Sequence, residues 1–387
     1  RTFSCAGGIP GAEALHGTVQ RGIAPPATIG SEPVRFDDDR SVALDAFAAQ
    51  ESRTKNWLAW LPCPEPRARW WFVGAGGAAV THDTVLTVHN PRPGQAVLDV
   101  DVLGADGPVE SPGLHGITIP SGGVEVIDLA KVAPAVGDLA VQVVATRGLV
   151  AVSAADRFAP GVVGKEVREW LPAQSAPTTS LTLTGLPAEP DRATLVVANP
   201  RRVESIVSIE VIGATGTFSP KSDATLTVPP GSVANVSVRS IFDGEPLAIR
   251  VTAPRPITAA VRTVTGGDVA FATAVRPIRD STTVAVPAVT GPGGSAQVVI
   301  SSVGPKAEVD LAAFDGSGKA LLEKAVSVAE ASSAAVPLPT GTRFVRLASA
   351  TPDAVAGFSV RDAAGVATAG VVPAIRSVLL PVVRPGW

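Results

Sequence analysis

The two cysteines, Cys5 and Cys63, are the residues whose chemistry depends most on where the protein resides. In a reducing cytosol two distant cysteines are usually unrelated thiols, whereas in an oxidising compartment they usually form a disulfide. The lack of Met, the low Lys content and the β-type repeats favour an exported chain. We therefore expect an extracytoplasmic protein, secreted or anchored by a segment upstream of residue 1. A Cys5–Cys63 disulfide would staple its N-terminal segment to the first folded unit.

Four of the six tryptophans, Trp57, Trp60, Trp70 and Trp71, lie close together in the sequence. Clustered indole rings can form a platform on which sugars stack, or a hot spot for binding another protein. The structural alternative is that they bury the N-terminal segment against the first folded unit, beside the disulfide. The cluster is the candidate binding site of the chain, and burial is its alternative.

Other potentially reactive residues lack the context that their chemistry needs. The stretch from Trp70 to Ala79 imitates the G-x-G-x-x-A fingerprint of dinucleotide binding, but a strand-like stretch follows where a helix is required. His82, His89 and His115 match no zinc pattern. The run Asp37–Asp39 lacks the rest of a calcium loop and predicts a solvated acidic turn. We therefore expect no metal, no cofactor and no catalytic residue.

Composition bounds the class of protein. Of 387 residues, 45% are hydrophobic and 17% are charged, which excludes a chain disordered throughout. The formal net charge of −3 argues against a nucleic-acid-binding protein. No uninterrupted apolar stretch approaches the ~20 residues of a membrane-spanning helix, so we expect no membrane span within these residues.

A tandem repeat of ~105 residues organises most of the chain. Each copy contains an apolar run that ends in a turn: Leu86 to Pro91, Leu195 to Pro200, and a weaker copy from Val298 to Pro305. An alternating stretch and a glycine turn follow in each copy. Because the side chains of a strand face alternately to either side, this alternation predicts strands with one buried face. About seven such runs per copy suit an immunoglobulin-like or fibronectin-like sandwich, whereas a β-propeller blade is too short for this period.

The sequence therefore predicts an all-β fold, a tandem array of three immunoglobulin/fibronectin-like antiparallel β-sandwiches. Boundaries are expected where the alternation lapses and Pro, Ser and charged residues gather. They give an N-terminal segment, 1–62, packed on the first sandwich, and sandwiches at 63–176, 177–281 and 282–387. Partial helical spacing over 41–52 predicts one short helix, and Leu380-Pro381 suggests that the C-terminal residues complete the third sandwich.

Several of these motifs together resemble the actinobacterial domain-of-unknown-function family 5719. They are Cys63-Pro-Glu-Pro, Trp71-Phe-Val-Gly, Leu86 to Asn90-Pro91, Gly104 to Gly107, Pro120-Ser-Gly122 and Leu139-Ala-Val to Val143. The resemblance covers most of the chain from about Cys63 onward and extends to an early cysteine such as Cys5. It implies an exported or membrane-anchored envelope protein, often encoded beside a large polytopic glycosyltransferase, and no catalytic residue is carried over from it.

Three functions from different classes are compatible with these observations. The leading hypothesis is a non-catalytic extracytoplasmic cell-envelope protein that acts as partner or scaffold of a membrane glycosyltransferase in envelope glycan assembly. The alternative is a carbohydrate-binding protein that holds cell-wall polysaccharide on the tryptophan cluster. A glycosidase with two carboxyl groups brought together at a domain junction is the third and least favoured.

Overall fold

Alternation of apolar and polar residues along the chain produces strands in nearly every element of the computed structural model. The structure describes residues 2–30, 32–37, 46–78, 80–134, 136–159, 165–174, 176–278 and 280–372. In β10 (Ala96–Gly104), for example, Leu98 and Val100 are buried while the aspartates between and after them are partly or fully exposed. The helix α1 (Leu129–Val132) has four residues. Among the described residues, no helix is long and apolar enough to cross a membrane.

The first of three strand units folds into two antiparallel sheets. Its strands are β8 (Arg69–Ala78), β9 (His82–His89), β10, β11 (Gly107–Val109), β12 (Ile117–Ile119), β13 (Val124–Asp128), β14 (Asp138–Arg147), β15 (Ala151–Phe158) and β16 (Val167–Leu171). One sheet has the order β11-β10-β14-β8, with β12 also on β10, and the other has the order β13-β9-β15-β16. A short pairing between the end of β8 and the start of β9 joins the two sheets.

The second unit repeats this arrangement with one long strand in place of two. Its strands are β17 (Thr178–Leu183), β18 (Arg192–Asn199), β19 (Ser205–Gly213), β20 (Gly216–Phe218), β21 (Thr225–Val228), β22 (Ser232–Ser237), β23 (Ala248–Thr265) and β24 (Asp268–Val275), with a short 3-10 turn at Arg239–Ile241. The first half of β23 pairs with β17 and β19, and its second half pairs with β18 and β24. This strand therefore belongs to both sheets.

The third unit shows the topology most plainly, with four strands in each sheet. Its strands are β25 (Asp280–Ala285), β26 (Ser295–Ser302), β27 (Ala307–Phe314), β28 (Ala320–Val328), β29 (Ser333–Pro337), β30 (Phe344–Ser349), β31 (Ala354–Arg361) and β32 (Val366–Gly370). The sheets have the orders β25-β30-β27-β28 and β29-β26-β31-β32. Residues of both sheets share one hydrophobic core.

The strand order differs from that of an immunoglobulin domain. There, the strand that follows F joins C and F in one sheet. In the third unit β30 takes the place of F beside β27, but the next strand, β31, crosses to the other sheet and lies beside β26. The first unit makes the same crossing between β14 and β15. The expectation of an all-β, antiparallel protein is confirmed, whereas the connections are not those of an immunoglobulin domain.

One repeated side chain, Asn90 or Asn199, ties two strand ends together in its unit. The Asn90 amide donates to the carbonyl oxygens of Ile119 and Pro120 at 3.1 Å each, 29 and 30 positions ahead. Asn199 makes the corresponding two bonds at the same spacing and distance. In the third unit Ser302 takes this place, and its shorter side chain donates to the carbonyl oxygens of Gly304 and Pro305 in its own turn. The repeated motif is thus a structural link between strand ends.

The N-terminal segment is also built of strands. They are β1 (Thr2–Cys5), β2 (Glu13–Thr18), β3 (Gly22–Ile23), β4 (Ala27–Thr28), β5 (Val34–Asp37), β6 (Ala46–Arg53) and β7 (Leu58–Pro62). The helix expected over 41–52 is wrong for 46–52, which belong to β6 because alternate residues of that stretch face two different cores. Residues 41–45, Asp38, Asp39 and the Leu380-Pro381 pair lie outside the described residues.

The sheet of this segment packs on two units at once. Ala14, Ala48 and Leu61 on one face join the core of the first unit, whereas Phe47 and Trp60 on the other face join the core of the third. The Phe47 ring lies 4.9 Å from that of Phe344 in the third unit. The expectation that the segment packs on the first sandwich therefore describes only one of its two contacts.

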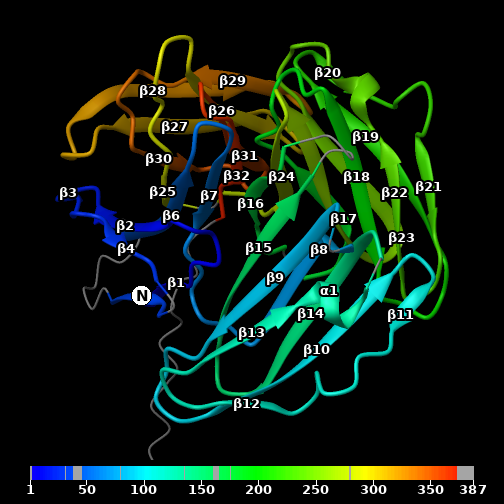
Figure 1. Cartoon of the computed structure of the whole chain (residues 1–387). Helices are drawn as coiled ribbons and strands as arrows, with labels where there is room; N and C mark the ends of the chain where they lie inside the picture. The colour runs from blue at the N-terminus through cyan, green and yellow to red at the C-terminus, as the bar shows by residue number, and fades with distance from the viewer. Residues whose placement is uncertain are drawn as a thin grey trace, which may run out of the picture.

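The units close into a ring instead of extending in a row. The last strands of the N-terminal segment and of the three units meet at the centre; they are β7, β16, β24 and β32. There β16 contacts β24, β24 contacts β32, and β7 contacts both β32 and β16. Figure 1 shows these four strands in the middle of the molecule, with the N-terminal segment in blue and the three units around them. The predicted array is thus corrected to a closed arrangement, because the N-terminal segment bridges the first and third units.

Equivalent outward-facing positions of the repeat make the contacts between neighbouring bodies of the ring. Val196 and Ala198 of β18 pack on Trp71 and Val73 of β8, so that the second unit covers the first. His89, 109 positions before Ala198 (198 − 89 = 109), faces β1 of the N-terminal segment in the same way. The first and second units therefore use the same face to contact the body that precedes each of them in the chain.

Candidate functional site

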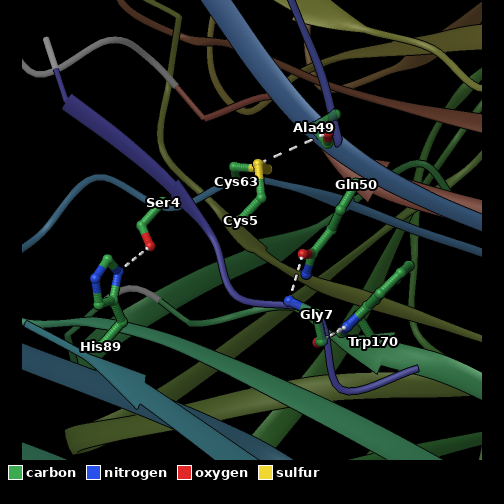
Figure 2. Close-up of a disulfide and its surroundings, with 8 residues drawn as sticks. All are labelled: Ser4, Cys5, Gly7, Ala49, Gln50, Cys63, His89 and Trp170. Atoms are coloured by element: carbon green, nitrogen blue, oxygen red, sulfur yellow. Dashed lines mark hydrogen bonds between the residues drawn. A yellow bond between two sulfur atoms is a disulfide. The ribbon is translucent and has the colours of Figure 1, made fainter. Parts of the chain in front are cut away.

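A disulfide between Cys5 and Cys63 joins the end of β1 to the residue after β7 (Figure 2). The two Cα atoms are 4.9 Å apart, and both residues are buried. Backbone bonds reinforce the link, because the Ser4 N–H donates to the Pro64 carbonyl at 3.0 Å and the Cys63 N–H donates to the Ala48 carbonyl at 2.9 Å. The predicted disulfide is confirmed. It fixes the first strand of the segment to the entry of the first unit.

His89 on β9 attaches β1 to the first unit. Its Nδ1 atom lies 2.6 Å from Oγ of Ser4 in a buried hydrogen bond, drawn in Figure 2. Burial, and then the nearby Arg35 guanidinium, lowers the pKa of His89 to about 4, so the ring is neutral at neutral pH. His115, in contrast, is exposed. Among the described residues, no group of three or more His, Cys, Asp or Glu is placed to hold a metal ion.

Gly7 is the point where the segment meets the end of the first unit. The indole N–H of the fully buried Trp170 on β16 donates to its carbonyl at 2.8 Å, and its own N–H donates to Oε1 of Gln50 at 3.1 Å (Figure 2). Gly7 has a φ of +70°, and a Cβ there would lie 2.7 Å from the Ile29 side chain. The position therefore needs glycine.

The four clustered tryptophans are buried in three different cores. Trp57 and Trp70 lie in the core of the first unit, Trp60 lies in that of the third unit, and Trp71 lies at the junction of the first and second units. Their exposed fractions are 8%, 2%, 1% and 5% in that order. These tryptophans are close in sequence but lie in different cores, because the strands that carry them pack against different units.

Polar contacts hold Trp70 in place. Its indole N–H lies within hydrogen-bonding distance of the Arg67 and Val150 carbonyls, at 3.2 and 3.1 Å. The Arg67 guanidinium lies 3.8 Å from the ring centroid, and burial lowers the pKa of Arg67 to about 10.

The burial of these four tryptophans contradicts the expectation that their cluster is a binding site. A sugar-stacking platform needs ring faces that are open to solvent. The indoles at 57, 60, 70 and 71 are all buried, so they act as interior packing between the bodies of the ring.

Glu169 on β16 holds two strands at the centre of the ring. Its Oε1 atom accepts the backbone N–H of Trp60 on β7 and of Trp170, both at 2.8 Å. Burial raises the pKa of Glu169 well above its ordinary value. The two N–H donors oppose that rise, and the charge of Asp268 adds to it.

Asp268, the first residue of β24, makes a second central link. Its Oδ2 atom accepts the backbone N–H of Leu58 on β7 at 3.1 Å and of Val366 on β32 at 2.9 Å. Burial raises its pKa to about 7, against the effect of these donors and of the Val269 N–H. A Cβ at Gly365 would overlap the carboxylate, so a glycine is needed beside it.

Sequence reasoning did not single out these two carboxyl groups. The available signal was an acidic residue among the apolar residues of a terminal strand: Glu169 in Val-Arg-Glu-Trp-Leu and Asp268 before Val-Ala-Phe-Ala. A lone acid in such a context is either at an exposed edge or buried with partners. Only the packing of four strands around one point decides between these two cases.

His82 and Asp156 connect the first unit to the second. Nε2 of His82 lies 3.1 Å from Oδ1 of Asp156, which also accepts the Thr84 hydroxyl at 2.6 Å. On its other side, Nδ1 of His82 lies 3.8 Å from Asp138, which is ion-paired with Arg262 of β23. The His–Asp pair is therefore part of a buried network between units.

Two open hollows mark the surface. The larger, of about 700 Å³, lies between the N-terminal sheet and the third unit and includes Glu13, Glu51, Arg53 and Arg343 in its lining. Glu51 is ion-paired there with Arg53 at 2.9 Å and lies 3.7 Å from Arg343. The smaller, of about 420 Å³, lies between the second and third units. Neither hollow reaches the central carboxyl groups or the four tryptophans.

These features define an all-β protein whose repeated units form a ring, with aromatic, histidine and carboxyl side chains used at the junctions. The chain belongs to the family of unknown function DUF5719, whose model matches residues 34–339. The resemblance read from the motifs is confirmed at this level.

Comparison with other proteins adds little to the family assignment. No curated protein matches the chain. One solved structure compared with it is that of infectious bursal disease virus Gx strain, which is 11% identical over 96% of this chain and 80% of that one. The TM-score of 0.13 is too low to indicate a common fold.

Proposed function

We propose that this protein is a non-catalytic extracytoplasmic scaffold of the cell envelope, and that its partner is a membrane glycosyltransferase or another protein of envelope glycan assembly. The observation that carries the proposal is the buried Cys5–Cys63 disulfide at the structural entry to the first unit. Stable structural disulfides are typical of proteins that fold in an oxidising compartment.

The use of the polar residues supports a contact role over a chemical one. His89 is a neutral anchor for β1, and His82 lies between Asp156 of its own unit and Arg262 of the second unit. Glu169 accepts backbone N–H groups from both β7 and β16. The side chains best suited to acid–base chemistry thus serve to hold the ring together.

The choice of partner rests on the family resemblance, which implies a neighbouring glycosyltransferase. The ring supplies outer strands for such a contact, with exposed apolar side chains at Val126 on β13, Ile206 on β19 and Phe218 on β20. Single exposed apolar residues are common on any surface. Here they serve as probe positions, because replacing them leaves the core unchanged.

Purification of the tagged full chain from native membranes in mild detergent tests the partner. We expect a glycosyltransferase to copurify at a stoichiometric ratio, and a photo-crosslinking residue at position 126, 206 or 218 to capture it. Recovery of the chain alone, with no crosslink from any position, would contradict the partnership. The double variant Cys5→Ser/Cys63→Ser is the control for a ring with a weakened N-terminal attachment.

The compartment is tested separately in cells. Alkylation of free thiols before and after reduction should modify Cys5 and Cys63 only after denaturation with reductant. Modification of both thiols in unreduced, denatured extracts would show that the disulfide does not form in the cell.

A further inference from the structure

Asp156 has one carboxylate oxygen that no donor among the described residues reaches. Its Oδ1 atom accepts the Thr84 hydroxyl and lies 3.1 Å from His82 Nε2, whereas its Oδ2 atom is buried without a hydrogen-bond partner. The residue is only 1% exposed. A buried carboxylate oxygen left without a donor is destabilising, so the site calls for a proton donor.

Glu169 is the candidate for that donor that the pairing of the strands indicates. It stands directly opposite Asp156 in the antiparallel pair of β15 and β16. Residues so paired have Cβ atoms about 4.5–5.5 Å apart and share one face of the sheet. Because Oε1 of Glu169 already accepts two backbone N–H groups, its other oxygen, Oε2, is the one left to carry a proton.

We propose that Glu169 remains protonated in the closed ring and donates that proton to Oδ2 of Asp156, and that this shared proton holds β7 against β16. Two carboxylates on neighbouring positions of a buried pair repel one another if both are charged, so one proton is retained by the pair. The direction of the Glu169 pKa, raised chiefly by burial, agrees with this arrangement.

The titratable and charged groups around the pair come from several neighbouring strands. They are His82 on β9, Asp138 on β14, Arg262 on β23 and Asp268 on β24, while the ion pair of Arg157 with Asp83 lies on the neighbouring positions of β15 and β9. Arg262 is engaged by Asp138, and Asp268 adds a negative charge. Their sum favours retention of the proton.

Loss of this proton at alkaline pH weakens the contact between the N-terminal segment and the first unit. The repulsion between the two carboxylates decreases when the Glu169 side chain moves away from Asp156. That movement breaks the hydrogen bond that the Trp60 N–H on β7 donates to Glu169. The segment stays attached through Cys5 and Cys63. The structure thus contains a proton-controlled clasp between the N-terminal segment and the first unit.

Hydrogen exchange of the full chain between pH 6 and 9.5, corrected for the intrinsic rate, tests the clasp. We expect protection of peptides from β7 and β16 to fall at least tenfold in the wild type, while peptides from β27 stay protected. Glu169→Gln always offers amide hydrogens to Asp156, so it should abolish this fall. Asp268→Asn is the control and should retain it. An equal fall in Glu169→Gln, or none in the wild type, would overturn the proposal.

Infrared spectroscopy gives a second measurement that does not depend on how that variant folds. The folded wild type at pH 7.5 should show the carbonyl stretch of a protonated carboxyl group that persists in Asp268→Asn, and this band should disappear in step with the loss of protection. In Asp156→Asn, which removes the neighbouring charge, the band should titrate away at a lower pH. A wild type without the band at pH 7.5, or a band that Asp156→Asn leaves unmoved, would also overturn the proposal.

Discussion

Oδ2 of Asp268 accepts the backbone N–H of Leu58 at 3.1 Å, across 210 positions of sequence. The bond joins the last strand of the N-terminal segment to the last strand of the second unit, two bodies that are not neighbours along the chain. The same oxygen also accepts the Val366 N–H of the third unit. One carboxyl group therefore ties three bodies of the ring together.

Replacement of Asp268 by Ala should destabilise the whole ring. It leaves the buried N–H groups of Leu58 and Val366 without an acceptor, at about 1–3 kcal/mol for each such group. Chemical denaturation should report the loss as a lower midpoint. Asp268→Asn is the matched control, because its amide oxygen still accepts both groups. Equal losses in the two variants would contradict the role of the acceptor.

The stability contributed by Asp268 should depend on pH in a defined direction. Its folded pKa is raised from 3.8 to about 7, so the folded state keeps a proton that the unfolded state has lost within that window. The contribution is complete below about pH 4 and declines until about pH 7, by about 4 kcal/mol at most. The free energy of unfolding of the wild type minus that of Asp268→Asn should therefore fall as pH rises from 4 to 7. A difference that stays flat or rises over this range would contradict the burial of a protonated Asp268.

His89 should act in the opposite direction at acid pH. Its folded pKa is lowered from 6.5 to about 4, so the unfolded state binds a proton that the folded state refuses between these values. Stability from this residue is present above pH 6.5 and is lost toward pH 4. His89→Gln should remove that loss while keeping a polar partner for Ser4, and the comparison is made by thermal unfolding at pH 7 and 4.5. A larger acid loss in the variant would refute this account.

Removal of the disulfide should weaken the N-terminal segment first. Cys5 and Cys63 are 58 positions apart, and closing a loop of that length contributes about 4 kcal/mol in the chain-entropy model. In Cys5→Ser/Cys63→Ser we expect a lower unfolding temperature, with early proteolysis confined to residues before β8. Limited digestion followed by mass spectrometry locates the cuts. Cleavage that starts in the third unit would argue against this order.

Trp71→Ala should separate the first and second units. Trp71 is 5% exposed and packs across their junction, and truncation of a buried Trp costs about 3–5 kcal/mol. Val126→Ala, at a side chain 59% exposed, is the control and should change stability by less than about 0.5 kcal/mol. The two midpoints in denaturant decide the matter. Similar values for both variants would show that Trp71 does not support the junction.

The local structure was largely predictable from the sequence. The alternation in stretches such as Val100-Asp-Val appears as strands, and the repeated Asn90 and Asn199 turns occupy the same place in their units. The Cys5–Cys63 disulfide also followed from composition and compartment. These features depend on residues that are close in sequence or few in number.

The arrangement of the units could not be predicted in the same way. Trp60 and Trp70 both look like core residues, yet nothing local says that one belongs to the third unit and the other to the first. The outward faces of β18 and β8 are apolar for the same reason that their inward faces are, because both are covered. Alternation identifies one buried face, and it loses its meaning where a strand is buried on both.

Closure of the ring also constrains the order in which the protein assembles. Cys5 and Cys63 are available to pair as soon as the first strands emerge, whereas the sheet they secure finds half of its core only in the third unit. Its contacts with Phe344 and with the Asp268–Val366 link wait for nearly the whole chain. We therefore expect the disulfide to form early and the N-terminal sheet to pack against the third unit late. Contacts between residues so far apart in sequence slow folding.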